Sequence, residues 1–152
     1  MEKISGKKKQ TQEECIELCM KVLRNMNCKV EIDEELTGKL DFKYQGCNFS
    51  IVCDSKYIRI WFLFWYEIDL DDIDRLVKAR RIINDLNLES QMQCIAYVIN
   101  DEQQKMYIHS FVGTVFINEI PALDELLERY IDEIFEKADE FKVRIATEEK
   151  AE

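Results

Sequence analysis

Four aspartates lie close together in the segment IDLDDID, at Asp69, Asp71, Asp72 and Asp74. Carboxylate oxygens are the ligands that Ca²⁺ and Mg²⁺ prefer, so one interpretation is a divalent-cation site. The spacing does not fit a calcium-binding loop, because Ile73 and Arg75 occupy ligand positions and no glycine makes the turn. Acidic side chains in the first turn of a helix also stabilise the positive end of the helix dipole. We therefore predict that this cluster starts a helix and holds no metal.

Six cysteines form the second group that could do chemistry: Cys15, Cys19, Cys28, Cys47, Cys53 and Cys94. Cys15 and Cys19 are one helical turn apart, and Cys47 and Cys53 would share one face of a strand. A structural zinc site takes four ligands, normally with a CxxC-type pair, and the sequence contains no such pair. Unevenly spaced thiols in a chain of this size indicate a reducing compartment, and free cysteine is among the most buried residue types. The sequence therefore predicts buried free thiols in a cytoplasmic protein, with no cofactor.

His109 is the one histidine of the chain, and it alternates with Tyr107 and Phe111 in a strand-like segment. A catalytic histidine needs a nucleophile and an orienting carboxylate nearby, and no spacing places them. We interpret His109 as structural or solvent-facing. With no other catalytic motif in the sequence, we predict no catalytic residue and no enzymatic activity.

The stretch YIRIWFLFWY (57–66) contains both tryptophans and carries five aromatic residues between positions 61 and 66. Side chains of a strand alternate between its two faces. One face would belong to the core and carry Ile58, Ile60, Phe62, Phe64, Tyr66 and Ile68. The other would carry Tyr57, Arg59, Trp61, Leu63, Trp65 and Glu67, and its central members are also large and apolar.

This second face has two interpretations. Exposed apolar patches mark partner sites, and tryptophan is enriched at binding hot spots, so Tyr57, Arg59, Trp61, Leu63 and Trp65 would contact a partner. Alternatively, a helix covers the face, or a β-bulge changes the alternation, because a strand over 57–68 is longer than usual.

The composition fits one acidic domain. The chain has 152 residues, a formal charge of −10 and a pI near 4.7, which disfavour binding to nucleic acid or to an anionic membrane and suit a basic partner. No segment is long and apolar enough to span a membrane, and the basic start has no apolar region behind it, as a secretory signal would. The predicted organisation is a disordered basic leader over 1–10, a single domain over 11–143 and a polar tail over 144–152.

Periodicity predicts the elements of this domain. Thr11 and Glu14 form a capping box that opens a helix to about residue 27. Strands are predicted at 40–44, 49–53 and 57–68, a helix from its cap at Asp69 to about 88, strands at 94–99 and 106–112, and a helix from Pro121 to 141. The short connections between the first three strands predict an antiparallel meander. The sequence thus predicts an α+β fold of order α-β-β-β-α-β-β-α, with helices packed on an antiparallel five-stranded sheet.

This order, with FKYQGCNFSIVCDSKYIRIW leading into the aromatic strand and IDLDDIDRLVKARRIIN following it, resembles the YbjN-like family. The resemblance covers Thr11 to Phe141 and is most specific over 57–60 and 69–84. It implies the fold that this family shares with the type III secretion chaperones. YbjN-like proteins are small bacterial proteins described as sensory-transduction regulators, and the chaperones are acidic homodimers that bind extended client segments through apolar surface. The resemblance carries over no active-site residue.

The residues and the resemblance together predict a non-enzymatic protein-interaction module of chaperone-like or regulatory type. It would form a homodimer or bind a client or regulatory partner through the aromatic sheet face, without binding nucleic acid or membrane. The alternative is an enzyme or small-ligand binder with a pocket between sheet and helices that uses the acidic cluster or His109. A third interpretation is a structural subunit of a larger assembly.

Overall fold

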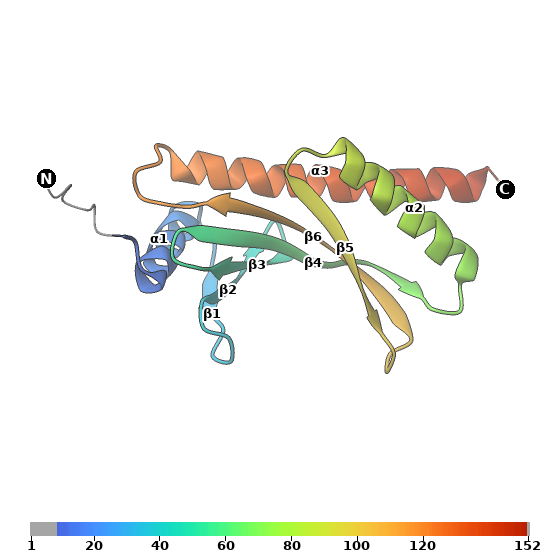
Figure 1. Ribbon diagram of the computed structural model, residues 1–152, viewed down its shortest axis with the longest axis horizontal. Helices are drawn as coiled ribbons and strands as arrows, with labels where there is room; N and C mark the ends of the chain where they lie inside the picture. Colours follow the sequence, from blue (N-terminus) through green and yellow to red (C-terminus); the bar gives the residue numbers. More distant parts are fainter. Residues whose placement is uncertain (1–8, 152) are drawn as a thin grey trace, which may run out of the picture.

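A computed structural model describes residues 9–151 of the chain, so the predicted leader over 1–10 lies almost entirely outside the described residues. The order of elements is α1 (Gln12–Asn25), β1 (Val30–Ile32), β2 (Lys39–Tyr44), β3 (Cys47–Cys53), β4 (Tyr57–Asp69), α2 (Ile73–Glu89), β5 (Gln93–Asn100), β6 (Lys105–Val115) and α3 (Leu123–Lys150). The strands form one antiparallel sheet in the order β1-β2-β3-β4-β6-β5. In Figure 1, α2 and α3 run along the same side of this sheet, and α1 lies at the end near β3.

The core lies between the sheet and the three helices. Phe49, Phe62 and Phe135 pack ring against ring where α3 crosses β3 and β4. Further along α3, Phe141 packs edge-on against Trp65 and Tyr66. These contacts confirm the predicted α+β class with helices on an antiparallel sheet.

The sheet has six strands rather than the predicted five. The additional strand β1 lies between the predicted first helix and the predicted strand at 40–44, where Val30, Glu31 and Ile32 pair with Phe42, Asp41 and Leu40. Its three residues are half-buried or exposed, and a run of three residues is too short for its alternation to distinguish a strand from a connection. An edge strand this short forms because β2 offers it unpaired backbone groups, and that is a tertiary effect.

A β-bulge interrupts β4 and corrects the predicted alternation. Phe62 lies opposite Ser110 and Tyr66 opposite Ile108, so three residues of β4 face His109 alone. Phe64 adopts a left-handed backbone conformation (φ 51°) and is 64% exposed, whereas Trp65 is 9% exposed. The face assignment was therefore wrong for Phe64 and Trp65, which exchange sides, and the bulge alternative is confirmed.

The acidic segment starts the second helix three residues later than predicted. β4 continues to Asp69, which pairs with Lys105 of β6, and the predicted cap at Asp69 is wrong for that reason. The N-cap is Asp72, whose carboxylate accepts a hydrogen bond from the backbone N–H of Arg75 (3.2 Å). The chemistry of the cap was predicted correctly, but its position depends on how far β6 extends the pairing.

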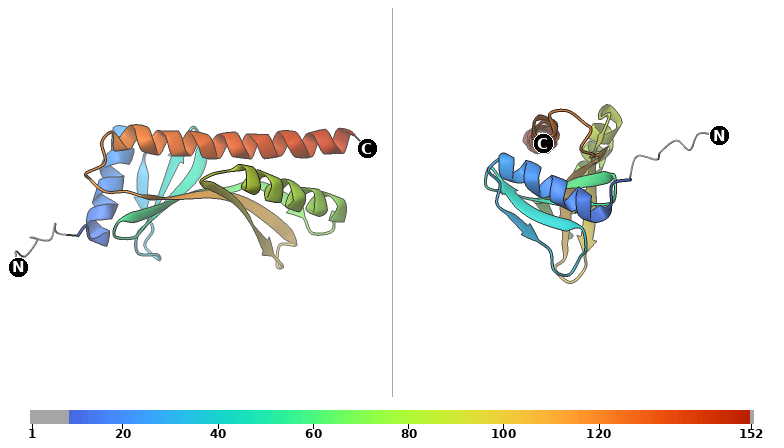
Figure 2. Two further views of the ribbon diagram at one scale, coloured as in Figure 1. Left: turned by 45° about the horizontal axis from the view of Figure 1, so that its top comes forward. Right: turned by 90° about the vertical axis from the view of Figure 1, so that its left-hand side faces the viewer.

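Helix α3 continues past the predicted domain end at residue 143. It runs to Lys150 as a regular helix, and Figure 2 shows it extending along the full length of the sheet. Ile145, in the segment interpreted as a polar tail, is 2% exposed and belongs to the core. Glu149 also pairs with Arg75 of α2 (2.6 Å), and Glu148 pairs with Arg81.

Candidate interaction surface

The face of the sheet opposite the helices carries the candidate site. All three helices place their buried residues against the inner face, and Figure 2 shows them on one side of the sheet. The outer face therefore has no layer over it among residues 9–151. Its side chains come from alternate positions of β3, β4, β6 and β5, which the strand pairing brings side by side.

The first half of the surface is built around Trp61 and Phe111, which are directly opposite each other in β4 and β6. Their ring centres are 4.6 Å apart. The guanidinium of Arg59 lies 5.0 Å from the Phe111 ring centre and 5.9 Å from that of Trp61, within the range of a cation–π contact. Arg59 has no carboxylate partner among the ion pairs of residues 9–151, so its contacts at this surface are with the two aromatic rings.

The second half is built by the bulge. Phe64 packs edge-on against Tyr107, with ring centres 5.2 Å apart, and against His109, with ring centres 4.6 Å apart. His109 and Phe111 are two residues apart on β6, so the two halves are continuous. We call this surface the aromatic strip and define it by the side chains of Arg59, Trp61, Phe64, Tyr107, His109 and Phe111.

Of the predicted partner residues, Tyr57, Arg59 and Trp61 lie on the outer face, and Leu63 is half-buried at the bulge. Trp65 lies on the inner face, where its indole Nε1–H donates to Ser110 Oγ (3.0 Å), because the bulge turns it toward α3. Sequence reasoning missed Phe64, Tyr107 and Phe111 as members of the surface. The alternation of Tyr107, His109 and Phe111 along one strand was a signal for Tyr107 and Phe111. Phe64 could not be assigned to the surface without knowledge of the bulge.

His109 holds the bulge in place. Its ring is 6% exposed, and its Nδ1 accepts a hydrogen bond from the backbone N–H of Phe64 (2.8 Å). An accepting Nδ1 requires the neutral ring with its proton on Nε2. Burial lowers the pKa of His109 below its ordinary value of 6.5, because desolvation disfavours the charged imidazolium. The structural interpretation of His109 is therefore correct, and its role is to replace a ladder hydrogen bond that the bulge removes.

We expect the free energy of unfolding to decrease at mildly acidic pH, because protonation of His109 breaks the hydrogen bond that holds the bulge. The unfolded chain binds the proton of His109 near pH 6.5, whereas the folded chain binds it only at lower pH, so the stabilisation is complete above 6.5 and decreases below it. One proton contributes at most about 1.4 kcal/mol per pH unit. Urea unfolding from pH 7 to 5 measures the slope, with His109→Asn as a control that keeps an acceptor but does not titrate. Equal slopes in the two proteins would contradict this role.

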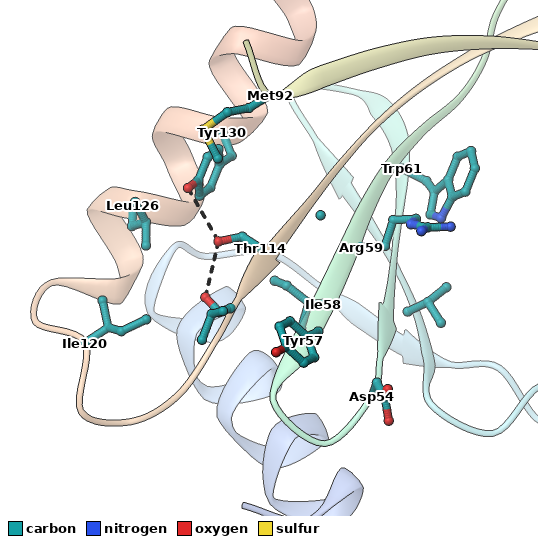
Figure 3. A pocket seen from close by; sticks show the side chains of 13 residues that line it. Asp54, Tyr57, Ile58, Arg59, Trp61, Met92, Thr114, Ile120, Leu126 and Tyr130 are labelled. Atoms are coloured by element: carbon teal, nitrogen blue, oxygen red, sulfur yellow. Dashed lines mark hydrogen bonds between the residues drawn. The ribbon is translucent and has the colours of Figure 1, made fainter.

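An open groove of about 990 Å³ adjoins the aromatic strip. It reaches both faces at the end of β6, since β5 begins opposite Val112 and leaves residues 113–115 without a strand neighbour on that side. Figure 3 shows Arg59 and Trp61 on one side of the β4–β6 pair and Leu126 and Tyr130 of α3 on the other. The hydroxyls of Thr114 and Tyr130 lie 3.4 Å apart across this edge.

The other candidate residues are placed differently. Among the described residues, the aspartates of IDLDDID do not form a group that could hold a cation, as Asp72 caps α2 and Asp69 lies beside Lys105. The cysteines are free and mostly buried, as predicted. Cys15 and Cys19 form a three-residue cluster with Cys53, and no fourth metal-ligating side chain of the described residues joins it. Cys47 lies outside this cluster. Within residues 9–151 no helix is long and apolar enough to cross a membrane.

The comparisons with known proteins bear on the fold. No protein-family model and no curated protein sequence matches the chain. Among solved structures, the chain is similar to YbjN, "a putative transcription regulator from E. coli", with a TM-score of 0.60 over 88% of this chain and 92% of that one. The sequence identity is 9%, so the likeness concerns the fold alone. The expected likeness to the YbjN fold is confirmed: the α+β fold of this chain is similar to that of YbjN.

Proposed function

We propose that the protein is a non-enzymatic interaction module of regulatory or chaperone-like type, and that its aromatic strip binds a partner protein. One observation carries the proposal: a continuous set of aromatic side chains lies on a sheet face that no helix of residues 9–151 covers. Aromatic residues and arginine are the types enriched at interface cores. The likeness to a protein described as a regulator supports the same class.

We favour a second copy of this chain as the partner. In a twofold dimer the same surface of each copy contacts its counterpart on the other copy. The aromatic strip has rings at both of its ends, with Arg59 at one end, so the rings of one copy can stack on those of the other. The protein carries a formal charge of −10, but acidic side chains contribute little to the strip itself, so the repulsion between two copies acts mainly outside the contact. Stacking would also cover Phe64 and Tyr57, which are exposed in the single chain.

The test is the oligomeric state of a variant in which Trp61 and Phe64 are replaced by serine. Light scattering coupled to size exclusion, over a dilution series, should show a dimer for the wild type and a monomer for Trp61→Ser/Phe64→Ser, because the removed rings are central to the strip. The matched control is Val77→Ser/Val143→Ser, which removes two exposed apolar side chains from the helices, away from the aromatic strip. A monomeric wild type, or a variant that remains dimeric, would overturn the homodimer.

A second candidate function is small-ligand binding in the groove beside the strip. Its volume of about 990 Å³ and its lining by Trp61, Leu126, Tyr130 and Met92 are typical of ligand sites. It contains neither His109 nor the acidic cluster, so it differs from the pocket that the sequence suggested. A metabolite-panel thermal shift that disappears in Tyr130→Phe/Thr114→Val would favour this function over the interaction module.

A further inference from the structure

Three buried sulfur atoms meet where α1 packs against the end of β3. The Sγ atoms of Cys15, Cys19 and Cys53 all lie within 4.8 Å of one another, and those of Cys19 and Cys53 are 3.6 Å apart. All three side chains are at most 2% exposed. Bonds of about 2.3 Å from sulfur to a central ion place three sulfurs about 4.0 Å apart in a planar arrangement, and closer in a pyramidal one. The pair of Cys19 and Cys53 is therefore already at the spacing of a three-sulfur site, and Cys15 lies less than 1 Å outside that spacing at most.

The backbone around the cluster is fixed. The two backbone hydrogen bonds of Cys53 go to Gly38, whose carbonyl accepts from the Cys53 N–H (2.7 Å), and to Gln12, whose side-chain Nε2 donates to the Cys53 carbonyl (3.1 Å). A Cβ on Gly38 would lie 2.7 Å from that carbonyl oxygen, so the approach requires glycine. Cys15 and Cys19 are one turn apart on a helix closed by the Thr11–Glu14 capping box. Both elements that supply sulfur are thus held independently of any ligand.

The thiols act on one another. Hydrogen bonds with the thiols of Cys19 and Cys53 lower the pKa of Cys15 to about 4. Hydrogen bonds with its two neighbours, together with burial, raise the pKa of Cys19, and the hydrogen bond with Cys15 and burial raise that of Cys53 to about 12. A ligand that removes all three protons must leave no charge in this buried place, because an uncompensated charge in a protein interior is strongly unfavourable.

Ligand number and charge select among the ions that prefer sulfur. Zinc takes four ligands, and residues 9–151 offer no fourth at this cluster. Copper(I) accepts three thiolates, but three thiolates around a single positive charge leave two negative charges in the core. Trivalent arsenic takes three sulfur ligands in a pyramid and balances their charge completely.

We propose that Cys15, Cys19 and Cys53 form a binding site for trivalent arsenic, or an ion of the same chemistry such as trivalent antimony. Arsenous acid, As(OH)₃, reacts with the three thiols to form three As–S bonds. Each thiol proton leaves with one hydroxide as water, so three waters are released and no redox change occurs. The product is neutral and links α1 to β3.

Entry of the ion depends on the opening of α1. This helix contributes only four buried residues to the core, Cys15, Cys19, Val22 and Leu23, so its local opening is less costly than global unfolding. Binding is therefore slower than at the half-exposed Cys47 and Cys94, and it accelerates in urea concentrations too low to unfold the protein.

The experiment uses the full chain carrying Cys28→Ala/Cys47→Ala/Cys94→Ala, which keeps only the three clustered thiols, with sodium arsenite as the probe. Native mass spectrometry should show one arsenic atom gained and three hydrogen atoms lost. The melting temperature should rise by roughly 5 °C or more when arsenite is at 100 times its dissociation constant. Zinc and copper(I) should produce smaller shifts than arsenite.

Removal of one clustered thiol distinguishes the site from unspecific thiol chemistry. Cys15→Ala and Cys53→Ala, each made in the same background and checked by circular dichroism, should bind arsenite about tenfold more weakly or worse and retain a hydroxyl on arsenic. If either variant fails to fold, the other carries the comparison. No adduct in the three-thiol protein, an adduct with fewer than three hydrogen atoms lost, or a larger shift with zinc or copper(I) would overturn the proposal.

Discussion

Trp65→Ala should lower the free energy of unfolding by about 3–5 kcal/mol, while Trp61→Ala should lower it by about 1 kcal/mol. Both indoles belong to β4, and unbroken alternation would place them on the same face. The difference arises because the bulge turns Trp65 into the core, 5.3 Å from the Phe141 ring centre, and leaves Trp61 half-buried on the outer face. Urea unfolding of the two variants measures the difference directly.

Two controls separate the packing of Trp65 from its hydrogen bond. Ser110→Ala removes the acceptor of the indole N–H and leaves a buried donor without a partner, which costs about 1–3 kcal/mol. Trp65→Phe keeps most of the ring volume and should cost less than Trp65→Ala. Equal losses for Trp61→Ala and Trp65→Ala would contradict the bulge, because a regular β4 would place both indoles on the same face.

Trp65→Phe also makes Trp61 the one indole of the chain, which gives a direct probe of the aromatic strip. Acrylamide should quench its fluorescence efficiently in dilute solution, where the outer face is open. Quenching should decrease as the concentration rises if two copies associate through the strip. The same variant thus reports both the register of β4 and the proposed partner.

The parts of the fold that follow from local patterns were predictable. The capping box at Thr11, confirmed by reciprocal hydrogen bonds with Glu14, depends on residues three apart. The period of Leu127, Ile131, Ile134 and Phe141, all fully buried, depends only on helical geometry. Such features are encoded within one or two turns of chain, so sequence alone contains them.

The features that sequence reasoning missed depend on distant residues. The bulge is held by a bond between the Phe64 N–H and His109, which are 45 residues apart. Alternation along β4 contains no sign of that partner. Without the bulge, Phe64 is assigned to the core and Trp65 to the surface, so the sequence prediction placed these two side chains on the wrong faces of β4.

The end of the domain shows a different kind of error. The segment after Val143 is rich in charge, and its composition suggests a tail, yet Ile145 stands one helical turn after Phe141 and continues the buried face. A charged composition is equally typical of the solvent-exposed face of a helix and of a disordered chain end, so it cannot distinguish the two. The spacing of a single apolar residue was the better signal.

Removal of residues 144–152 should therefore lower the free energy of unfolding by about 2–4 kcal/mol rather than leave it unchanged. Most of the loss comes from Ile145, which is 2% exposed. The rest comes from the pairs of Glu149 with Arg75 and Glu148 with Arg81, which are partly exposed and contribute about 1 kcal/mol or less each. Denaturant midpoints of the truncated and full-length proteins provide the measurement.

Point variants assign that loss to its causes. Ile145→Ala alone should reproduce most of the effect of truncation, and Glu148→Gln/Glu149→Gln only a small part of it. Val143→Ala is the matched control, because Val143 lies on the same helix, is 65% exposed and should change stability by less than about 0.5 kcal/mol. If truncation and Ile145→Ala both leave the midpoint unchanged, the domain ends at residue 143 and the last turns of α3 do not contribute to its core.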